Sequence, residues 1–185
     1  MKKKNLLYVS ALCACMSFSF IGCSDDDDKQ EIPSLPEQIS LNGVYVLNSG
    51  NKGNNNSSLS FYDFETKKVE ADIFKKVNGR GLGDTANDIL VYGSKAYIAV
   101  TNSNTIEVTD LQGKSLKQIV SDGDPLQPRF FTCYNGKVYV SLYEGYVARL
   151  DTTSLSIESK VKVGRNPEQM AIANNKLYVA NSGGA

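Results

Sequence analysis

From Leu41 onward, hydrophobic and polar residues alternate with a period of two, which predicts β-strands over most of the chain. The alternation is clearest in four related segments that each contain a tyrosine: Gly43–Asn48, Lys95–Val100, Lys137–Leu142 and Lys176–Asn181. No stretch keeps a helical period over any length. We therefore predict that this part of the chain consists of strands and turns.

Each of the first three tyrosine strands is followed by three more predicted strands. The second strand of the group alternates and ends in an aspartate, at 58–63, 104–110 and 146–151. The third strand is predicted at 68–73, 115–120 and 156–163. A Gly/Pro-rich loop then precedes the fourth strand, at 88–92, 130–134 and 168–173. Two-residue turns, typical of β-hairpins, join each fourth strand to the next tyrosine strand: Gly93-Ser94, Asn135-Gly136 and Asn174-Asn175.

The tyrosines of this repeat are 52, 42 and 39 residues apart, at Tyr45, Tyr97, Tyr139 and Tyr178. Such spacing is typical of the four-stranded blades of a β-propeller. One sheet of this kind cannot bury both of its faces, so neighbouring sheets must stack around an axis. We predict an all-β chain in which residues 41–185 form a partial β-propeller of about three to three and a half four-stranded antiparallel blades.

A closed propeller usually has about four to eight blades, so this count leaves a partial ring. Three explanations stay open: a truncated gene or record, closure by self-association, or an open fragment. Truncation is favoured, because an isolated half-ring exposes apolar flanks and edge strands. On this interpretation the 23–185 segment is a poorly soluble monomer.

The first residues carry the pattern of a lipoprotein signal peptide, predicted at 1–22. Three lysines precede the apolar run Leu6–Phe20, which is too short to span a bilayer comfortably. Phe20-Ile21-Gly22-Cys23 resembles the lipobox of bacterial lipoproteins, although leucine is usual where Phe20 stands. The resemblance implies that Cys23 is acylated and anchors the chain in a lipid membrane. The alternative lipobox Leu12-Cys13-Ala14-Cys15 is less favoured, because cleavage there would leave the hydrophobic segment Met16–Ile21 near the start of the mature chain.

The residues after Cys23 are predicted to be a lipid-anchored, acidic, proline-containing linker, 23–40. The run Asp25–Lys29 resembles the acidic signal that sends some Gram-negative lipoproteins to the outer face of the outer membrane. It is also consistent with a solvated tether or with an engineered tag, but its place beside the lipobox argues against a tag. We therefore expect a lipid-anchored protein at the cell surface.

The amino-acid composition of the chain argues against several classes of function. The chain has 185 residues, 41% of them hydrophobic, and a balanced formal charge, so nothing indicates nucleic acid as a partner. It contains no histidine, the usual general base and zinc ligand. Cys133 lies in an apolar run and is predicted to be a small buried hydrophobe, and no second cysteine is left for a disulfide after lipidation of Cys23. We predict no catalytic residue, no metal and no cofactor, and favour a binding module over an enzyme.

The loop after each tyrosine strand and the loop before each fourth strand are expected on one face, because strands within a blade run up and down. That face is rich in amides and has three arginines, a composition that suits a polar ligand with amide or hydroxyl groups. The longest of these loops, Leu47–Leu59, is rich in Asn, Gly and Ser, and such loops often carry binding residues. The alternative is that Asn, Gly and Asp simply form turns. The candidate ligand-binding residues are Asn48, Asn51, Asn54, Asn55, Asn56, Arg80, Asp84, Asn102, Arg129, Tyr143, Arg165 and Asn181; Asn87, Asn104, Asp124, Glu144 and Glu168 are expected on the same face.

The cadence of the repeats, and Tyr178-Val-Ala-Asn181 in particular, resembles the YVTN-type repeats of the YncE-like, surface-layer-like propeller family over residues 41–185. The loop Leu47–Leu59, with Ser60–Asp63 and Asn78–Asp84, is similar to surface propeller lipoproteins that capture cobalamin for a TonB-dependent outer-membrane transporter. This resemblance implies that asparagines meet the amide rim of a corrinoid and that an arginine meets its phosphate. Two alternatives stay open: a structural or adhesive surface-layer protein that binds a protein or a glycan, and, as a minor one, a quinoprotein-like propeller enzyme.

Overall fold

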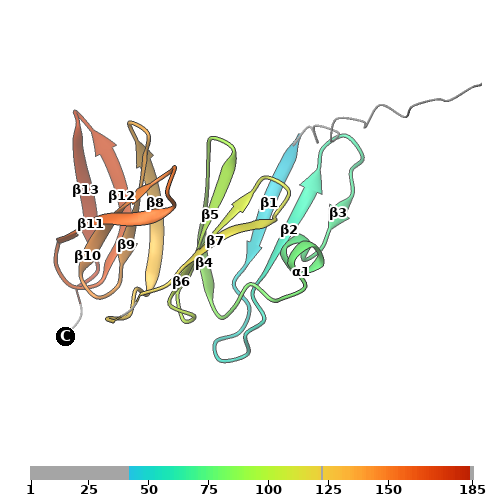
Figure 1. Ribbon diagram of the computed structural model, residues 1–185, viewed down its shortest axis with the longest axis horizontal. Coiled ribbons are helices and arrows are strands. Elements are labelled where there is room, and N and C mark those ends of the chain that lie inside the picture. The colour runs from blue at the N-terminus through green and yellow to red at the C-terminus, as the bar shows by residue number, and fades with distance from the viewer. Residues whose placement is uncertain (1–41, 122, 184–185) are drawn as a thin grey trace, which may run out of the picture. The chain divides into compact units, whose positions relative to one another are not determined.

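The computed structural model describes residues 42–121 and 123–183, which all belong to one compact unit (Figure 1). They form thirteen β-strands and one short helix. The predicted signal peptide, the predicted linker and Cys23, the predicted lipidation site, lie outside the described residues.

Two sheets are complete four-stranded antiparallel blades. The first consists of β4 (Ala86–Tyr92), β5 (Lys95–Val100), β6 (Thr105–Asp110) and β7 (Ser115–Ile119), in that order. The second repeats the order with β8 (Pro128–Tyr134), β9 (Lys137–Leu142), β10 (Tyr146–Asp151) and β11 (Ser156–Lys162). The prediction of an all-β fold made of antiparallel propeller blades is confirmed.

The outer two sheets hold fewer strands within the described residues. The first contains β1 (Gly43–Asn48), β2 (Ser58–Asp63) and β3 (Val69–Glu70). The last contains β12 (Pro167–Ala173) and β13 (Lys176–Asn181). Strands β4, β8 and β12 contact one another in succession and form the inner edge of neighbouring blades, as in a partial ring.

The predicted hairpin turns are confirmed in all three places. Strand pairs β4/β5, β8/β9 and β12/β13 are each joined by two residues, so that Tyr92 pairs with Lys95, Tyr134 with Lys137 and Ala173 with Lys176. Both residues of the second and third turns have positive φ. Glycine and asparagine tolerate that conformation better than other residues do, which is why the turns could be read from sequence.

The aspartates that end the second strands shape the next turn. One carboxylate oxygen of each of Asp63, Asp110 and Asp151 accepts hydrogen bonds from two backbone N–H groups that follow it. The N–H of Thr66 lowers the pKa of Asp63, and the ammonium of Lys137, together with the turn N–H groups, holds the pKa of Asp151 well below its usual range. The repeated aspartate is therefore a turn-forming residue.

The predicted third strand of the first blade, 68–73, is wrong in its second half. Strand β3 covers only Val69–Glu70, and helix α1 (Ile73–Asn78), a single short helix within the all-β fold, follows. The Asp72 side chain accepts a hydrogen bond from the Lys75 N–H at 3.3 Å and begins the helix, and Gly79, with φ 68°, ends it. The Asp72 side chain thus binds a backbone N–H group in the first turn of the helix, and the Gly79 N–H donates to the Lys75 carbonyl in the last turn.

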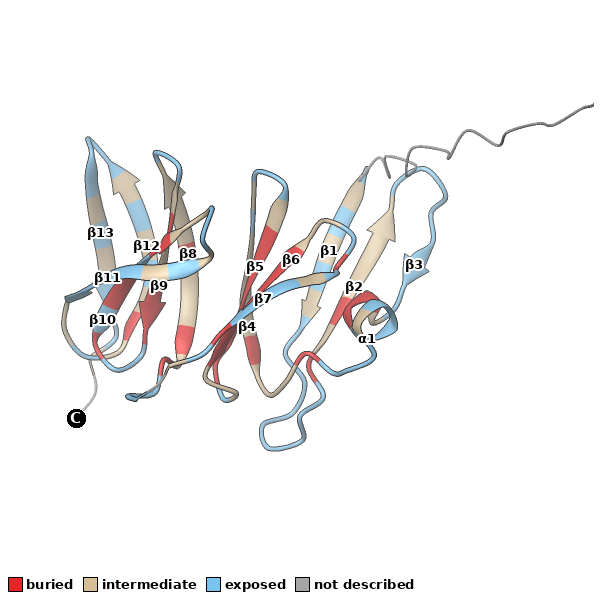
Figure 2. Ribbon diagram, in the orientation of Figure 1, coloured by how far each residue is buried: buried red, intermediate tan, exposed pale blue. Residues whose placement is uncertain are grey.

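Buried apolar side chains gather between neighbouring sheets (Figure 2). One cluster joins β5, β6 and β7 to β8, β9 and β10, with Tyr97, Phe131 and Leu150 among its members. A smaller cluster joins α1 and the first sheet to β4 and β5 and contains Leu59 and Phe74. The thiol of Cys133 is free and only partly buried, packed against the first cluster, so its predicted burial is partial.

Candidate functional site

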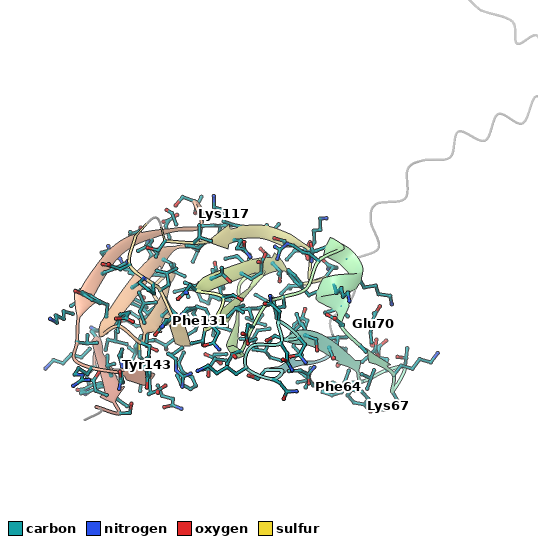
Figure 3. All side chains as sticks on the ribbon, turned by 90° about the horizontal axis from the view of Figure 1, so that it is seen from below. Phe64, Lys67, Glu70, Lys117, Phe131 and Tyr143 are labelled. Carbon is teal, nitrogen blue, oxygen red and sulfur yellow. The ribbon has the colours of Figure 1, made fainter. Side chains whose placement is uncertain are left out.

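In the three sheets that contain β4, β8 and β12, the connections at one end of the strands are joined to each other by the same backbone hydrogen bond. It runs from Thr101 to Thr85, from Tyr143 to Gln127 and from Ser182 to Asn166, at 2.9 to 3.0 Å. Each links the connection after a tyrosine strand to the connection before the inner strand of the same sheet. We call this set of connections the loop face: 49–57, 79–85, 101–104, 120–121, 123–127, 143–145 and 163–166. They lie along the lower side of Figure 1, and Figure 3 is viewed from that side.

The first connection of the loop face, 49–57, is fixed to the connection before β4. The Gly53 N–H donates to a carboxylate oxygen of Asp84 at 2.8 Å, and the Ser57 N–H donates to the Gly83 carbonyl at 3.0 Å. Gly50 has φ 73°, and a Cβ there would lie 2.4 Å from the side-chain oxygen of Asn56. This long loop is therefore held at several points along its backbone.

Three of the predicted amides in this loop are available to a ligand. Asn51, Asn54 and Asn55 are exposed, and within the described residues no hydrogen bond uses their side-chain amides. Asn56 differs, because its side-chain oxygen accepts the Asn51 N–H at 2.8 Å. Lys52 lies among them, exposed and without an ion pair in the described part of the chain. The sequence analysis did not name it, although its position in the loop was the available signal.

Three further predicted asparagines brace the fold. The Asn48 amide donates to the hydroxyls of Ser58 and Ser60, both at 3.2 Å. Asn102 donates to the Thr85 hydroxyl at 3.1 Å, and Asn181 donates to the Val163 carbonyl at 3.0 Å. All three are exposed, but their donors are already used at strand ends.

Arg129 lies at the start of β8 between two partners. Its guanidinium donates to both carboxylate oxygens of Glu168 on β12, at 3.0 and 3.3 Å. Its central carbon lies 5.4 Å from the centre of the Tyr143 ring, which is 37% exposed on the loop face and labelled in Figure 3. The Asn87 amide of β4 donates to the Arg129 carbonyl at 2.7 Å. A polar row thus crosses the three inner strands where they meet the loop face.

The structure separates Arg80 from the other candidates. Its guanidinium turns toward β6 and donates to both carboxylate oxygens of Glu107, at 2.9 and 3.0 Å. Glu107 is completely buried, and the Arg80 guanidinium also stacks on Phe74 at 4.8 Å. Arg80 therefore joins the first sheet to the second.

Of the remaining candidates, Asp84 acts within the loop face itself. Its carboxylate accepts the Gly53 N–H and the Thr85 hydroxyl, both at 2.8 Å. Arg165 is exposed in the connection before β12. Two of the three predicted arginines thus already contact a carboxylate. The loop face presents exposed amides, the Tyr143 ring, and exposed charged groups of both signs such as Lys52 and Glu144.

Within the described residues, no group of three or more His, Cys, Asp or Glu side chains is arranged to hold a metal ion. Helix α1, the one helix among the described residues, is too short to cross a membrane.

Comparison with known proteins bears on the family and the fold. A family model described as "Domain of unknown function (DUF5074)" matches residues 42–185. No curated protein matches the chain in sequence.

Solved structures resemble the chain at low identity. Hydrazine synthase from Kuenenia stuttgartiensis is 18% identical with a TM-score of 0.56, and the match covers 68% of this chain and 36% of that one. A functionally unknown protein from Desulfotomaculum acetoxidans DSM 771 is 14% identical with a TM-score of 0.55, covering 74% and 45%. The computationally designed Ika4 protein is 9% identical with a TM-score of 0.54, covering 68% and 74%. The chain thus spans less than half of the two natural proteins, and these likenesses show the fold alone.

Proposed function

Because the chain belongs to the DUF5074 family, whose description assigns no activity, we propose its function from the loop face: the protein is a non-catalytic module that binds a polar, uncharged or weakly charged ligand. The observation that carries the proposal is the loop 49–57. Its backbone is fixed by Asp84 and Gly83, while the amides of Asn51, Asn54 and Asn55 have no partner in the described residues. A fixed loop with unused donors and acceptors loses little entropy on binding.

The chemistry of the loop face favours hydrogen bonding over charge pairing. Each asparagine amide offers two donors and an acceptor. Arg129 and Arg80 are already paired with Glu168 and Glu107, so they contribute less to an anionic group than free arginines would. A ligand with a rim of amides or hydroxyls therefore suits the face better than one recognised through phosphate.

A corrinoid is the first ligand class to test, because its macrocycle carries a rim of amides. Two resemblances seen in the sequence also motivate this choice: that of the repeats to the YncE-like family, and that of the loops to surface lipoproteins that deliver cobalamin to a TonB-dependent transporter. In the same proposal Cys23 anchors the chain to the outer membrane at the cell surface, which places the loop face where a nutrient can be captured.

A neutral glycan is a second candidate, favoured by one specific observation. Tyr143 is 37% exposed beside Arg129 on the loop face. An exposed aromatic ring next to amides can stack on a sugar ring while the amides bond to its hydroxyls. This candidate corresponds to an adhesive surface protein.

Isothermal titration of the full chain with cyanocobalamin, and separately with maltohexaose, distinguishes the two. The double variant Asn51→Ala/Asn54→Ala should weaken the true ligand about 30-fold, because each lost hydrogen bond contributes about 1 kcal/mol. Gln112→Ala, which removes an exposed amide at the opposite ends of the strands, should leave the affinity unchanged.

Binding of cyanocobalamin with this response supports the corrinoid proposal, and binding of maltohexaose alone supports the adhesive one. Absence of heat with both probes, or an unchanged affinity in the double variant, refutes the proposed use of the loop face.

A further inference from the structure

A cavity of about 650 Å³ opens beside helix α1, at the ends of the strands opposite to the loop face. Its wall combines β1, β2, β3 and α1 with the turn between β6 and β7. Representative lining residues are Tyr45, Phe61, Lys68, Ile73, Val77 and Leu111. None of the candidates on the loop face contributes to it, so the cavity is independent of the site described above.

The cavity is there because the first sheet departs from the repeat. The outer strands of the next two sheets, β7 and β11, are five and seven residues long, whereas β3 has only two. The chain leaves β3 at Glu70 and forms α1 instead of continuing along β2. Helix α1 buries Ile73 and Phe74 but leaves the end of β2 uncovered on its outer side.

The interior surface of the cavity is mainly apolar. The rings of Tyr45 and Phe61 pack against each other with their centres 5.2 Å apart. The Tyr45 hydroxyl donates to the Leu111 carbonyl across the gap between the two sheets. That hydroxyl is therefore already used, and the tyrosine offers the cavity its ring, beside aliphatic groups of Ile73 and Val77.

The rim of the cavity carries two carboxylates and two ammonium groups, and these differ in how far they are already engaged. Glu70, labelled in Figure 3, forms an ion pair with Lys76. The Asp63 carboxylate accepts two backbone N–H groups and lies near the ammonium of Lys67. Lys68 has no ion pair within the described residues. The Lys68 ammonium is therefore the cation of the rim that is not already held in an ion pair, and it lies next to an apolar interior.

We propose that this cavity binds an amphipathic organic anion, a small molecule with an apolar or aromatic body and a carboxylate or sulfonate group that meets Lys68. Its volume lies in the range of about 300 to 1,000 Å³ that small-molecule sites occupy. The body covers Tyr45, Phe61 and Val77 and removes their apolar surface from water. The acid group pairs with the exposed Lys68 ammonium at the rim, and such a pair orients the ligand and adds a modest attraction.

The test is a fluorescence titration of the full chain with 8-anilinonaphthalene-1-sulfonate, followed by competition with decanoate. We expect saturable binding at one site and displacement by the fatty acid. Lys68→Glu should weaken the probe about fivefold, because it replaces an attraction at the exposed rim by a repulsion. Val77→Trp, which places a large ring into the cavity from α1, should also weaken it, whereas the charge-matched control Lys160→Glu on β11 should not.

Circular dichroism of each variant confirms that the sheets are retained before the titration is interpreted. Equal probe affinity in the wild type, Lys68→Glu and Val77→Trp overturns the proposal, as does binding without saturation. The loop-face variant Asn51→Ala/Asn54→Ala should leave the probe affinity unchanged. A loss of probe binding in that variant would overturn the assignment to this cavity and point to the loop face.

Discussion

The contact between the second and third sheets differs from the contact between the first and second sheets, although both come from the same repeat. Between β4–β7 and β8–β11, buried apolar side chains such as Tyr97, Phe131 and Leu150 fill the space. Between β1–β3 and β4–β7, the apolar cluster is smaller. This contact also contains helix α1, the ion pair of the buried Glu107 with Arg80, and a cavity of about 650 Å³.

This difference shows how a repeat protein accommodates the shortening of one strand in one repeat. A full third strand allows the next sheet to pack against a continuous apolar surface. Where β3 stops after two residues, polar groups and a helix must complete the contact. Glu107 shows this most clearly, because its buried carboxylate is bound by Arg80 from the first blade and by Ser115 and Gln118 from β7.

The largest expected effect comes from truncating a side chain in the regular contact. Leu150→Ala removes a side chain with no exposed surface and should lower the free energy of unfolding by about 3 kcal/mol, because it leaves a cavity in a filled core. Val77→Ala, at the rim of the existing cavity and 41% exposed, should cost less than about 0.5 kcal/mol. Urea denaturation measures both, and equal losses would remove the distinction between the two contacts.

Removing Arg80, the half-exposed partner of the buried Glu107, should have the next largest effect. Arg80→Met leaves the Glu107 carboxylate buried without its cation, and we expect a loss of about 2 kcal/mol. The loss stays below that of a fully enclosed pair, since the Arg80 side chain is 41% exposed. The double variant Arg80→Met/Glu107→Leu should recover most of the stability, because two apolar groups of similar size replace the pair. A double variant less stable than Arg80→Met would contradict this interpretation.

Most of the fold could be predicted from sequence because its signals are local. The alternation of Lys95–Val100, the aspartate that ends β2 and the pair Asn135-Gly136 each specify a strand or a turn within a few residues. The failure at 68–73 was also local. Asp72 and Gly79 are helix caps that flank an apolar pair, and they outweigh a short alternation.

The candidate site was harder to predict because side-chain partners lie far apart in sequence. Nothing near Arg80 indicates that its guanidinium meets Glu107, which is 27 residues away and on another sheet. The same holds for Arg129 and Glu168, which are 39 residues apart. Loop composition placed the asparagines on one face, but only the hydrogen bonds separate the braced Asn48 and Asn181 from the unused amide of Asn54.

The smallest predicted effects compare Tyr45 and Tyr97, which occupy the same position in successive repeats. The Tyr45 hydroxyl donates to the Leu111 carbonyl, so Tyr45→Phe should cost about 1 kcal/mol. The Tyr97 hydroxyl is buried without a partner in the described residues, so Tyr97→Phe should be neutral or stabilise by up to about 1 kcal/mol. Urea denaturation at neutral pH measures both, and a larger loss in Tyr97→Phe than in Tyr45→Phe would refute the comparison.

Alkaline pH sharpens the same comparison at Tyr45. Burial, with a contribution from the Asp110 carboxylate, raises the pKa of Tyr45 from 10.0 to about 12. The unfolded chain therefore releases this proton at a lower pH than the folded chain, and the stability that depends on the protonated phenol is lost as the pH rises from about 10 to about 12. Tyr45→Phe cannot ionise at this position, so its unfolding midpoint in urea should fall less over that interval than the wild-type midpoint does. Parallel declines in the two proteins would mean that Tyr45 ionises equally in the folded and unfolded chains, and that the hydroxyl is not held in the contact with Leu111.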